Sequence, residues 1–455
     1  MKTTRSALRP TFRKSAKAAG VLATATIVGL ALASCAAPGS GGTTTGTTAT
    51  AITAEVTAAD VAKLGDITLK MWADQAEEPL MKSVIPAFEK EYPNVTIDMT
   101  YKSFDDLLAT TVNAAASASP PDVFQGNIGY ALDGALVKAK LVRSLDDVAD
   151  VYGWNTGTGA STLAPAMWDE TGTTFGAGTL YGMSPISEVQ GIYYNADKLK
   201  ELGITAPTTI ADLEKDLVIA KAAGEQPIML GNSDQYAGTH IYSDIAATTQ
   251  DPKDIATWIG GKAGSTFVTD GNKQAADTMT AWAKAGYFGA GYDGLSNGDA
   301  IAKFAKGDGV FFVGGSWNGA SLTDGNFGFG SLASGGVGAT ASPWHISSKS
   351  KNAVAGIAFL AMLHTPEVGQ EILDGGRLPV ITDGVTGTSE LQTQTLDGLK
   401  ATIAAGTQVG YYDWTATDML TVMGGALQEV MAGRITSDEY TEKVQAAWAA
   451  THEAK

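Results

Sequence analysis

Cysteine is almost absent from this chain of 455 residues, in which Cys35 is the only one. A single thiol excludes an intrachain disulfide framework and every site that needs several thiolates. The four histidines (His240, His345, His364 and His452) lack the close spacing of a zinc site. We therefore expect neither a metal site nor a cofactor.

Positive charge is also scarce, because 31 Lys and Arg residues face 48 Asp and Glu residues and give a net charge of -17. Binding to nucleic acid or to an anionic membrane surface needs clustered Lys and Arg, so neither partner is expected. Hydrophobic residues make up 44% of the chain and charged residues 17%, which is typical of a globular protein. The length predicts two or three domains.

No hydrophobic run near the N-terminus is long enough to span a membrane. The apolar run 21–33 has about 13 residues, whereas a transmembrane helix needs about 20. A stretch with six basic residues precedes it, and Leu32-Ala33-Ser34-Cys35 follows. This order is typical of a secretory signal, and its last four residues resemble the bacterial lipobox. We predict a signal peptide at 1–34 and a palmitate-bearing lipid anchor on Cys35.

The residues after Cys35 are predicted to form a flexible tether over 35–60. The part from Ala36 to about Ala58 is rich in Ala, Gly, Thr and Ser and has almost no large apolar side chain. Removal of 1–34 would leave 25 basic and 48 acidic residues, a net charge of -23. The protein is thus expected outside the cytoplasm, held at the outer face of the cell membrane by its lipid alone.

From about Val61 onward, strand and helix patterns alternate. Period-two alternation predicts strands at 67–72, 95–101 and 122–125, and helices are predicted at 79–92 and 104–117. Pro86 is expected to kink or shorten the first of these helices. This order favours an α/β fold with a largely parallel sheet, whose ligands bind beyond the carboxyl ends of the strands.

The second half of the chain also alternates strand and helix patterns, but its predicted elements differ in length from those of the first half. Strands are predicted at 191–195 and 310–313, and helices at 196–203, 210–223 and 352–363, with another helix starting at Thr365. The segments 314–317 and 375–379 are rich in glycine or end in proline, and each follows a predicted element.

The order of these segments resembles extracellular solute-binding protein family 1, the sugar-binding lipoproteins of bacterial ABC importers related to maltose-binding protein. The segments that carry the resemblance are EKEYPNV, PPDVFQGN, LYGMSPISEVQGIYYNADKL, FAKGDGVFFVGGSW, SKNAVAGIAFLAMLHTPE and GGRLPV. They run through most of the chain. Ser342-Pro343-Trp344 departs from the pattern, because relatives often carry consecutive glycines before the aromatic residue, and Pro86 is a second departure.

The resemblance implies a two-lobed α/β fold of the type II periplasmic-binding-protein kind, with a ligand cleft between the lobes. Lobe 1 would take 61–180 and 341–383, and lobe 2 would take 184–335 and 388–455. The protein would be a monomeric receptor, without catalytic residues, that captures a sugar and delivers it to the permease subunits of an ABC importer.

The site residues expected from this resemblance are aromatic or polar and lie near strand ends or turns. Aromatic rings cover the apolar faces of a sugar, while carboxylates, amides and Arg bind its hydroxyls. The predicted binding residues are Trp72, Asp74, Gln75, Asn127, Glu188, Tyr236, Trp317, Trp344 and Arg377. Asp413 and Trp414 are further candidates. Core packing is the alternative for each tryptophan, and a solvated loop position is the alternative for each polar residue.

Two other functions remain open on the sequence. The first is a receptor of the same fold for a non-sugar solute, and the second is an exported glycan hydrolase. Three or more aromatic residues at the cleft favour a sugar. A hydrolase would need two carboxylates at a fixed separation, which a sequence does not place.

Overall fold

The computed structural model describes residues 51–156, 162–322, 324–331, 337–406 and 408–453. The chain divides into Met1–Thr48 and the compact unit Ala49–Lys455. The predicted signal peptide, Cys35 and most of the predicted tether therefore lie outside the described residues. Within the described ranges, no helix is both long and apolar enough to cross a membrane, and no group of three His, Cys, Asp or Glu side chains is arranged to hold a metal ion.

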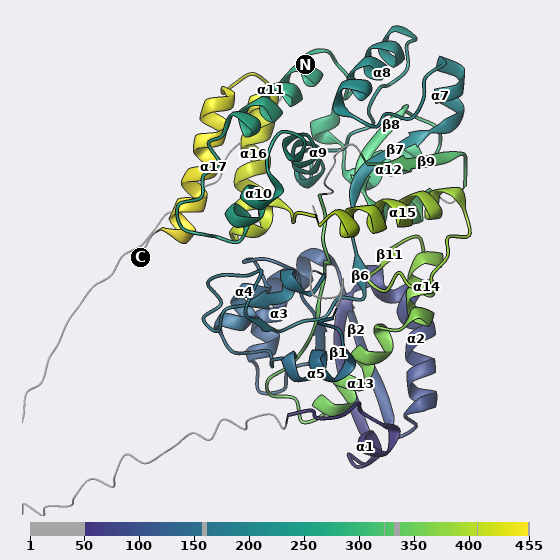
Figure 1. The fold of residues 1–455 in the computed structure, drawn as a ribbon, viewed down its shortest axis with the longest axis vertical. Helices are drawn as coiled ribbons and strands as arrows, with labels where there is room; N and C mark the ends of the chain where they lie inside the picture. The colour runs from purple at the N-terminus through teal and green to yellow at the C-terminus, as the bar shows by residue number, and fades with distance from the viewer. Residues whose placement is uncertain (1–50, 157–161, 323, 332–336, 407, 454–455) are drawn as a thin grey trace, which may run out of the picture. The chain divides into compact units, whose positions relative to one another are not determined.

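The first sheet has four strands in the order β10-β3-β1-β2. Its strands β1 and β2 are labelled in Figure 1. Strands β1 (Ile67–Asp74), β2 (Val95–Lys102) and β3 (Val123–Gln125) are parallel, and β10 (Trp344–Ile346) pairs antiparallel with β3. Alternate residues of β1 are buried, among them Met71, and belong to the same core as Phe88 and Phe359. The intervening side chains of β1, which include Trp72, therefore lie on the opposite face of the sheet.

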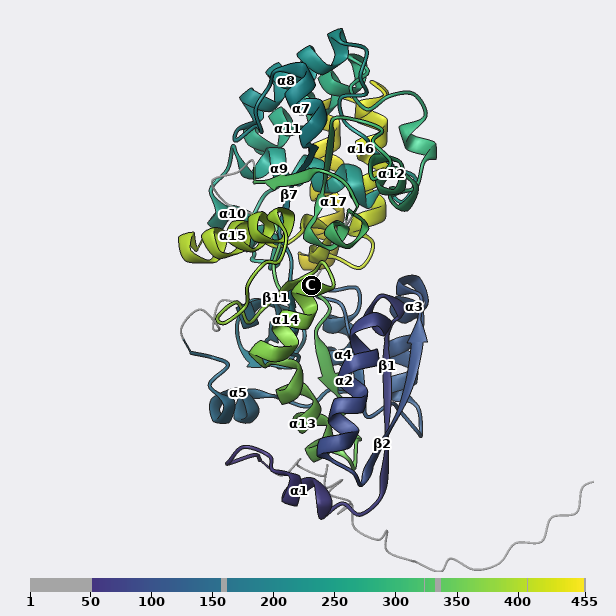
Figure 2. The same cartoon turned by 90° about the vertical axis from the view of Figure 1, so that its right-hand side faces the viewer.

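Seven helices of the described residues surround this sheet: α1 (Ala58–Ala62), α2 (Glu78–Glu91), α3 (Phe104–Ala116), α4 (Asp133–Lys138), α5 (Asp146–Tyr152), α13 (Ala353–Leu363) and α14 (Pro366–Asp374). Of these, α2, α3, α13 and α14 lie near predicted positions, and α1, α4 and α5 were not predicted. Helices α13 and α14 both pack on α2 (Figure 2). Helix α2 continues past Pro86, so this proline does not shorten the helix. Pro86 is exposed, and water can therefore solvate the carbonyl that lacks its helical donor.

The second sheet has three strands in the order β8-β7-β9, and all its pairs are antiparallel. Its strands are β7 (Gln190–Asn195), β8 (Phe311–Gly315) and β9 (Phe327–Gly330). The surrounding helices are α7 (Ala196–Leu202), α8 (Ile210–Ala222), α9 (Tyr236–Ala247), α10 (Pro252–Ile259), α11 (Asp270–Lys284), α12 (Asn297–Phe304), α15 (Glu390–Ala405), α16 (Met419–Met431) and α17 (Ser437–His452). The largely parallel sheet predicted from the first half of the chain is thus confined to the first lobe.

Short strands connect the two lobes. Strand β6 (Ile186–Ser187) precedes β7 and pairs antiparallel with β11 (Leu378–Pro379), which follows α14. The remaining hairpin joins β4 (Met167–Trp168) to β5 (Thr179–Leu180). A further segment runs between the sheets from β9 to β10, and its Val337 forms a single β-bridge with Val409. The chain therefore passes several times between the sheets through segments too short to form a rigid layer.

Candidate functional site

The end of β1 brings two predicted site residues to the first lobe's sheet edge. The Asp74 N–H donates to the Gln125 side chain at 2.9 Å, and the Asp74 carboxylate accepts the Ala76 N–H at 2.6 Å. Asp74 is half-buried and burial raises its pKa, whereas Gln75 is exposed. Asp74 therefore caps the short helix that follows and keeps a carboxylate at the strand end.

Asn127 follows β3 and is held by a buried pair that the sequence analysis missed. The Asn127 N–H donates to Asp133 Oδ1 at 2.9 Å, and the same oxygen lies 3.1 Å from His345 Nε2. His345 Nδ1 lies 2.8 Å from the Tyr181 carbonyl oxygen, so Nδ1 carries a proton. Burial raises the pKa of Asp133, and His345 opposes that shift. The pair fixes the backbone of Asn127, whose side chain is half-buried.

Trp72 lies on the sheet face opposite Met71 and is partly buried against the core. It lines a cavity of about 380 Å³ together with Lys70, Asp98 and Thr100. The Lys102 ammonium lies 4.2 Å from the centroid of the indole ring. The ring is half-buried and can therefore offer a flat surface to a ligand.

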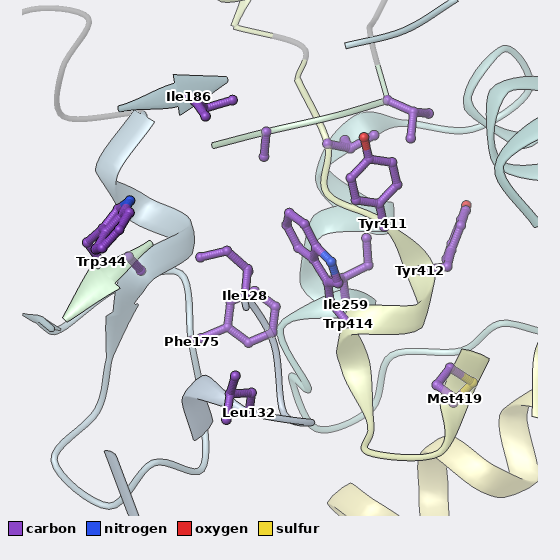
Figure 3. Close-up of a cluster of buried hydrophobic side chains, with 14 of the residues drawn as sticks. Ile128, Leu132, Phe175, Ile186, Ile259, Trp344, Tyr411, Tyr412, Trp414 and Met419 are labelled. Carbon is purple, nitrogen blue, oxygen red and sulfur yellow. The ribbon is translucent and has the colours of Figure 1, made fainter. Parts of the chain in front are cut away.

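Trp344 differs from the other predicted tryptophans because its exposed fraction is 0%. Its ring lies 5.9 Å from that of Phe359 of α13, and its indole N–H has no hydrogen-bond partner among the described residues. Figure 3 shows it among other buried side chains. The whole of β10 is buried. This position favours a role in the core, and a ligand contact of Trp344 stays a prediction.

The turn before Trp344 contains a strained residue. Ser342 has a φ of 53°, in the left-handed region that glycine adopts without strain. A glycine would therefore be the easier residue at this turn.

Five aromatic side chains from three segments form what we call the ring cluster: Tyr236, His240, Trp317, Tyr411 and Trp414. Tyr236 and His240 lie on α9, Trp317 lies in the short helix Ser316–Ser321, and the other two lie at the short helix Tyr412–Thr415. His240 stacks on Tyr411 with centroids 4.6 Å apart, and lies 5.7 Å from Trp317 and 5.4 Å from Tyr236. Tyr411 also meets Trp414 at 5.1 Å.

The edges of the ring cluster are accessible while its centre is not. Tyr236 and Trp317 are half-buried, whereas His240 is buried and accepts a hydrogen bond from the Gln190 side chain at 2.9 Å. Burial lowers the pKa of His240 to about 3, so its ring is neutral at pH 7. The ring cluster is therefore an uncharged group of aromatic side chains in which Tyr236 and Trp317 are partly exposed. Such a surface is suited to the apolar face of a sugar.

Five carboxyl groups interact electrostatically with Tyr411 of the ring cluster or with Arg377. Together with Arg377 we call them the acidic cluster: Asp74, Glu77, Glu188, Asp244 and Asp413. Arg377 Nη1 lies 2.7 Å from Glu77 Oε1, and Glu77 is 1% exposed. Arg377 also interacts electrostatically with Glu188 and Asp74. The Tyr411 hydroxyl donates to Glu188 at 3.3 Å and joins the two clusters.

Burial sets the protonation of this acidic cluster. It raises the pKa of Glu188 to about 7, although Arg377 opposes the shift. It raises the pKa of Asp413 to about 6 and that of Asp244 well above its ordinary value. These groups therefore hold protons that an exposed carboxylate would release.

The structure brings together most of the predicted residues but adds some that were missed. Glu188, Tyr236, Trp317, Arg377 and Asp74 belong to the two clusters, as do the further candidates Asp413 and Trp414. The sequence analysis missed Glu77, His240, Tyr411 and Asp244. His240 follows Tyr236 by one helical turn, so helical spacing could have indicated it.

A larger cavity lies elsewhere. It has a volume of about 1180 Å³, is lined by residues of α2, α13, α14 and α15, and contains Trp154 and His364. None of the predicted site residues lines it. We place the candidate site at the two clusters, because polar strand ends and partly open rings converge there.

Comparison with known proteins agrees with this fold. The chain matches the family model of the bacterial extracellular solute-binding proteins over residues 72–370. The multiple sugar-binding protein of Streptococcus mutans is 23% identical over 355 residues, which cover 72% of this chain and 78% of that protein.

Solved structures with similar folds include two proteins whose ligands are named. A chitin oligosaccharide binding protein has a TM-score of 0.71 at 19% identity, with 86% of this chain and 100% of that chain covered. RafE in complex with raffinose, a protein known from Streptococcus pneumoniae, has a TM-score of 0.65 at 21% identity, with 85% and 100% covered.

These similarities confirm the predicted two-lobed α/β fold of the periplasmic binding proteins. The matched family and the structural neighbours consist of solute-binding proteins that act outside the cytoplasm. Since the family model covers most of its length, this chain belongs to the family of bacterial extracellular solute-binding proteins.

Proposed function

We propose that the protein is the substrate-binding receptor of a carbohydrate ABC importer. It captures a sugar between its lobes, delivers it to the permease subunits and performs no catalysis itself. The observation that carries the proposal is the ring cluster, in which two partly open aromatic rings adjoin hydrogen-bonding carboxylates. The sugars named for the relatives support the same class of ligand.

The mechanism follows from the connections between the lobes. A receptor can report its loading by closing about a hinge, which the short crossover segments at β6 and β11 can provide. Closure requires that the sugar contact both lobes in one state and mainly one lobe in the other. The proposed contacts are divided in this way: Trp72, Asp74, Asn127 and Arg377 would act from lobe 1, and Glu188, Tyr236 and Trp317 from lobe 2.

Sugar binding can be tested directly on purified protein. Calorimetry and thermal shift over a panel of mono- and oligosaccharides should give saturable binding and a raised melting temperature, because a ligand that binds only the folded state stabilises it. Chromatography of the same mixtures should show unchanged glycans. Glycan cleavage would support an exported hydrolase, and binding of amino acids, peptides or polyamines without any sugar would support a receptor for another solute.

The lipid anchor is a further part of the proposal. Cys35 is the only cysteine and follows Leu-Ala-Ser, which places its thiol where lipidation would need it. We expect Cys35→Ser to move the protein from the membrane fraction to the soluble fraction. A single acyl chain binds only marginally, so the lipid of the wild type should carry more than one. Equal retention of both proteins after a salt wash would contradict the anchor.

A further inference from the structure

We propose that the sugar bound at this site carries a basic nitrogen, as an amino sugar does. The inference rests on the proposed function and specifies its ligand class. It depends on two independent features of the described residues: the balance of charge around the ring cluster, and a set of buried oxygen atoms that lack hydrogen-bond donors.

The charge around the ring cluster is unbalanced. Arg377 interacts electrostatically with Asp74, Glu77 and Glu188. Tyr411 interacts electrostatically with Glu188, Asp244 and Asp413. Arg377 already forms an ion pair with Glu77 at 2.7 Å. The nearby Lys102 lies over the Trp72 ring at 4.2 Å, and no ion pair joins it to a carboxylate of the acidic cluster. Glu188 shares the single guanidinium of Arg377 with Glu77 and Asp74, and no cationic side chain of the described residues acts on the pKa of Asp244 or Asp413.

Three buried oxygens of the acidic cluster and one of Gln190, whose side chain contacts His240, have no donor within the described part of the chain. Among the described residues, Glu77 Oε2, Gln190 Oε1, Asp244 Oδ2 and Asp413 Oδ1 lack a hydrogen-bond partner. Glu77 and Gln190 are each 1% exposed, and Asp244 is 5% exposed. A buried acceptor without a donor is costly, so a ligand that donates hydrogen bonds gains affinity by satisfying it.

An ammonium group meets both requirements. It supplies three donors and a positive charge that can replace the protons held by these carboxyl groups, whereas a hydroxyl supplies one donor and no charge. The neighbouring rings of Trp317 and Tyr411 also attract a cation through their faces. The raised pKa of Glu188 is the expected state of such a site before its cation arrives.

Pairs of sugars that differ at one substituent test the proposal. The first set is a β-1,4-linked tetramer with ammonium, N-acetyl or hydroxyl groups at C2. The second set is glucose, galactose and mannose, each with its 2-amino counterpart. Calorimetry at pH 6 keeps the amines charged. We expect at least one amino sugar to bind about tenfold or more tightly than its neutral partner, with an advantage that shrinks as salt is added.

Proton release provides a second readout. At pH 6 Glu188 holds a proton in the free protein, and an incoming ammonium should displace it to solvent. Calorimetry in two buffers with different heats of ionisation should therefore show proton release for the amino sugar and much less for its neutral partner. A merely structural role of Glu188 would leave the two ligands alike.

Matched variants locate the effect. Glu188→Gln should remove most of the amino sugar's advantage while retaining binding of the neutral partner. Glu201→Gln removes the same charge at an exposed position of α7 and should leave the advantage unchanged. If Glu188→Gln fails to fold, Asp413→Asn is expected to act in the same direction.

The outcomes separate the two proposals. A neutral sugar that binds as tightly as its amino counterpart would overturn the amino-sugar inference and leave the receptor function intact. Absence of binding by every sugar of both sets would overturn both. An advantage that persists in Glu188→Gln and Asp413→Asn would assign the cation to another place and would also overturn the inference.

Discussion

At the scale of single residues, two tryptophans that look alike in the sequence occupy different environments. Both Trp317 and Trp344 follow a small-residue turn, but Trp317 is half-buried in the ring cluster while Trp344 is fully buried beside Phe359. Their substitution should therefore have opposite consequences for binding and for stability.

Trp317→Ala should weaken sugar binding by about 1–3 kcal/mol, because the ring covers an apolar sugar face, and should leave the fold intact. Trp344→Ala should instead lower the free energy of unfolding by about 3–5 kcal/mol, because it leaves a cavity in the core. Calorimetry and urea denaturation of both variants measure the two effects. A strong loss of stability for Trp317→Ala, at unchanged affinity, would assign that ring to the core.

Glu188 makes stability depend on pH. The folded protein holds its proton up to about pH 7, whereas the ordinary pKa is 4.5. The folded state therefore binds more protons between these values, and stability falls as pH rises from about 4.5 to 7. Glu188→Gln should match the wild type near pH 4 and exceed its stability at pH 8, on the order of 1–3 kcal/mol.

Urea denaturation at both pH values measures this difference. Glu201→Gln, at its exposed position, serves as the control and should show no such pH dependence. A constant difference between Glu188→Gln and the wild type at all pH values would show that Glu188 has the same pKa in the folded and unfolded states, and would contradict the raised pKa.

At the scale of elements, the junction between α14 and β11 supports the short helix that carries Trp317. Gly376 has a φ of 79°, and a Cβ there would lie 2.6 Å from Ala320 Cα. Ala320 belongs to the same helix, Ser316–Ser321, as Trp317. A side chain at 376 must therefore displace that helix or distort the junction.

Gly376→Ala should weaken sugar binding and also lower the free energy of unfolding, by about 1–3 kcal/mol. Gly203→Ala is a matched control, because Gly203 has a φ of 69° but nothing lies within 4 Å of its Cβ position. The control should show the backbone strain without the loss of affinity. Equal affinities of the two variants would mean that the helix of Trp317 does not respond to this junction.

At the scale of the whole molecule, a ligand that contacts both lobes should favour a closed state. Small-angle scattering with a saturating, tightly bound sugar should then show a smaller radius of gyration than without it, or a change in the distance distribution. Glu188→Ala should reduce the affinity and leave a residual interaction with lobe 1. Identical scattering in both states would contradict ligand-driven closure.

The sequence by itself determined the class of fold, five main strands of the two sheets (β1, β2, β3, β7 and β8), six of the helices, and the polar residues at strand ends. These follow from local periodicity, from Pro and Gly punctuation and from the order of segments, all of which act over short stretches of chain. Asp74, Glu188 and Trp317 could be chosen on that basis, because Asp74 ends a strand, Glu188 directly follows one and Trp317 lies two residues after one.

Only the tertiary structure decided which side chains meet. The ion pair between Glu77 and Arg377 joins residues 300 positions apart, and the ring cluster draws on three separate segments between Tyr236 and Trp414. The burial of Trp344 likewise depends on α13, which packs against β10. Local pattern carries no record of such long-range packing, because burial and charge compensation are properties of the assembled core rather than of any one segment.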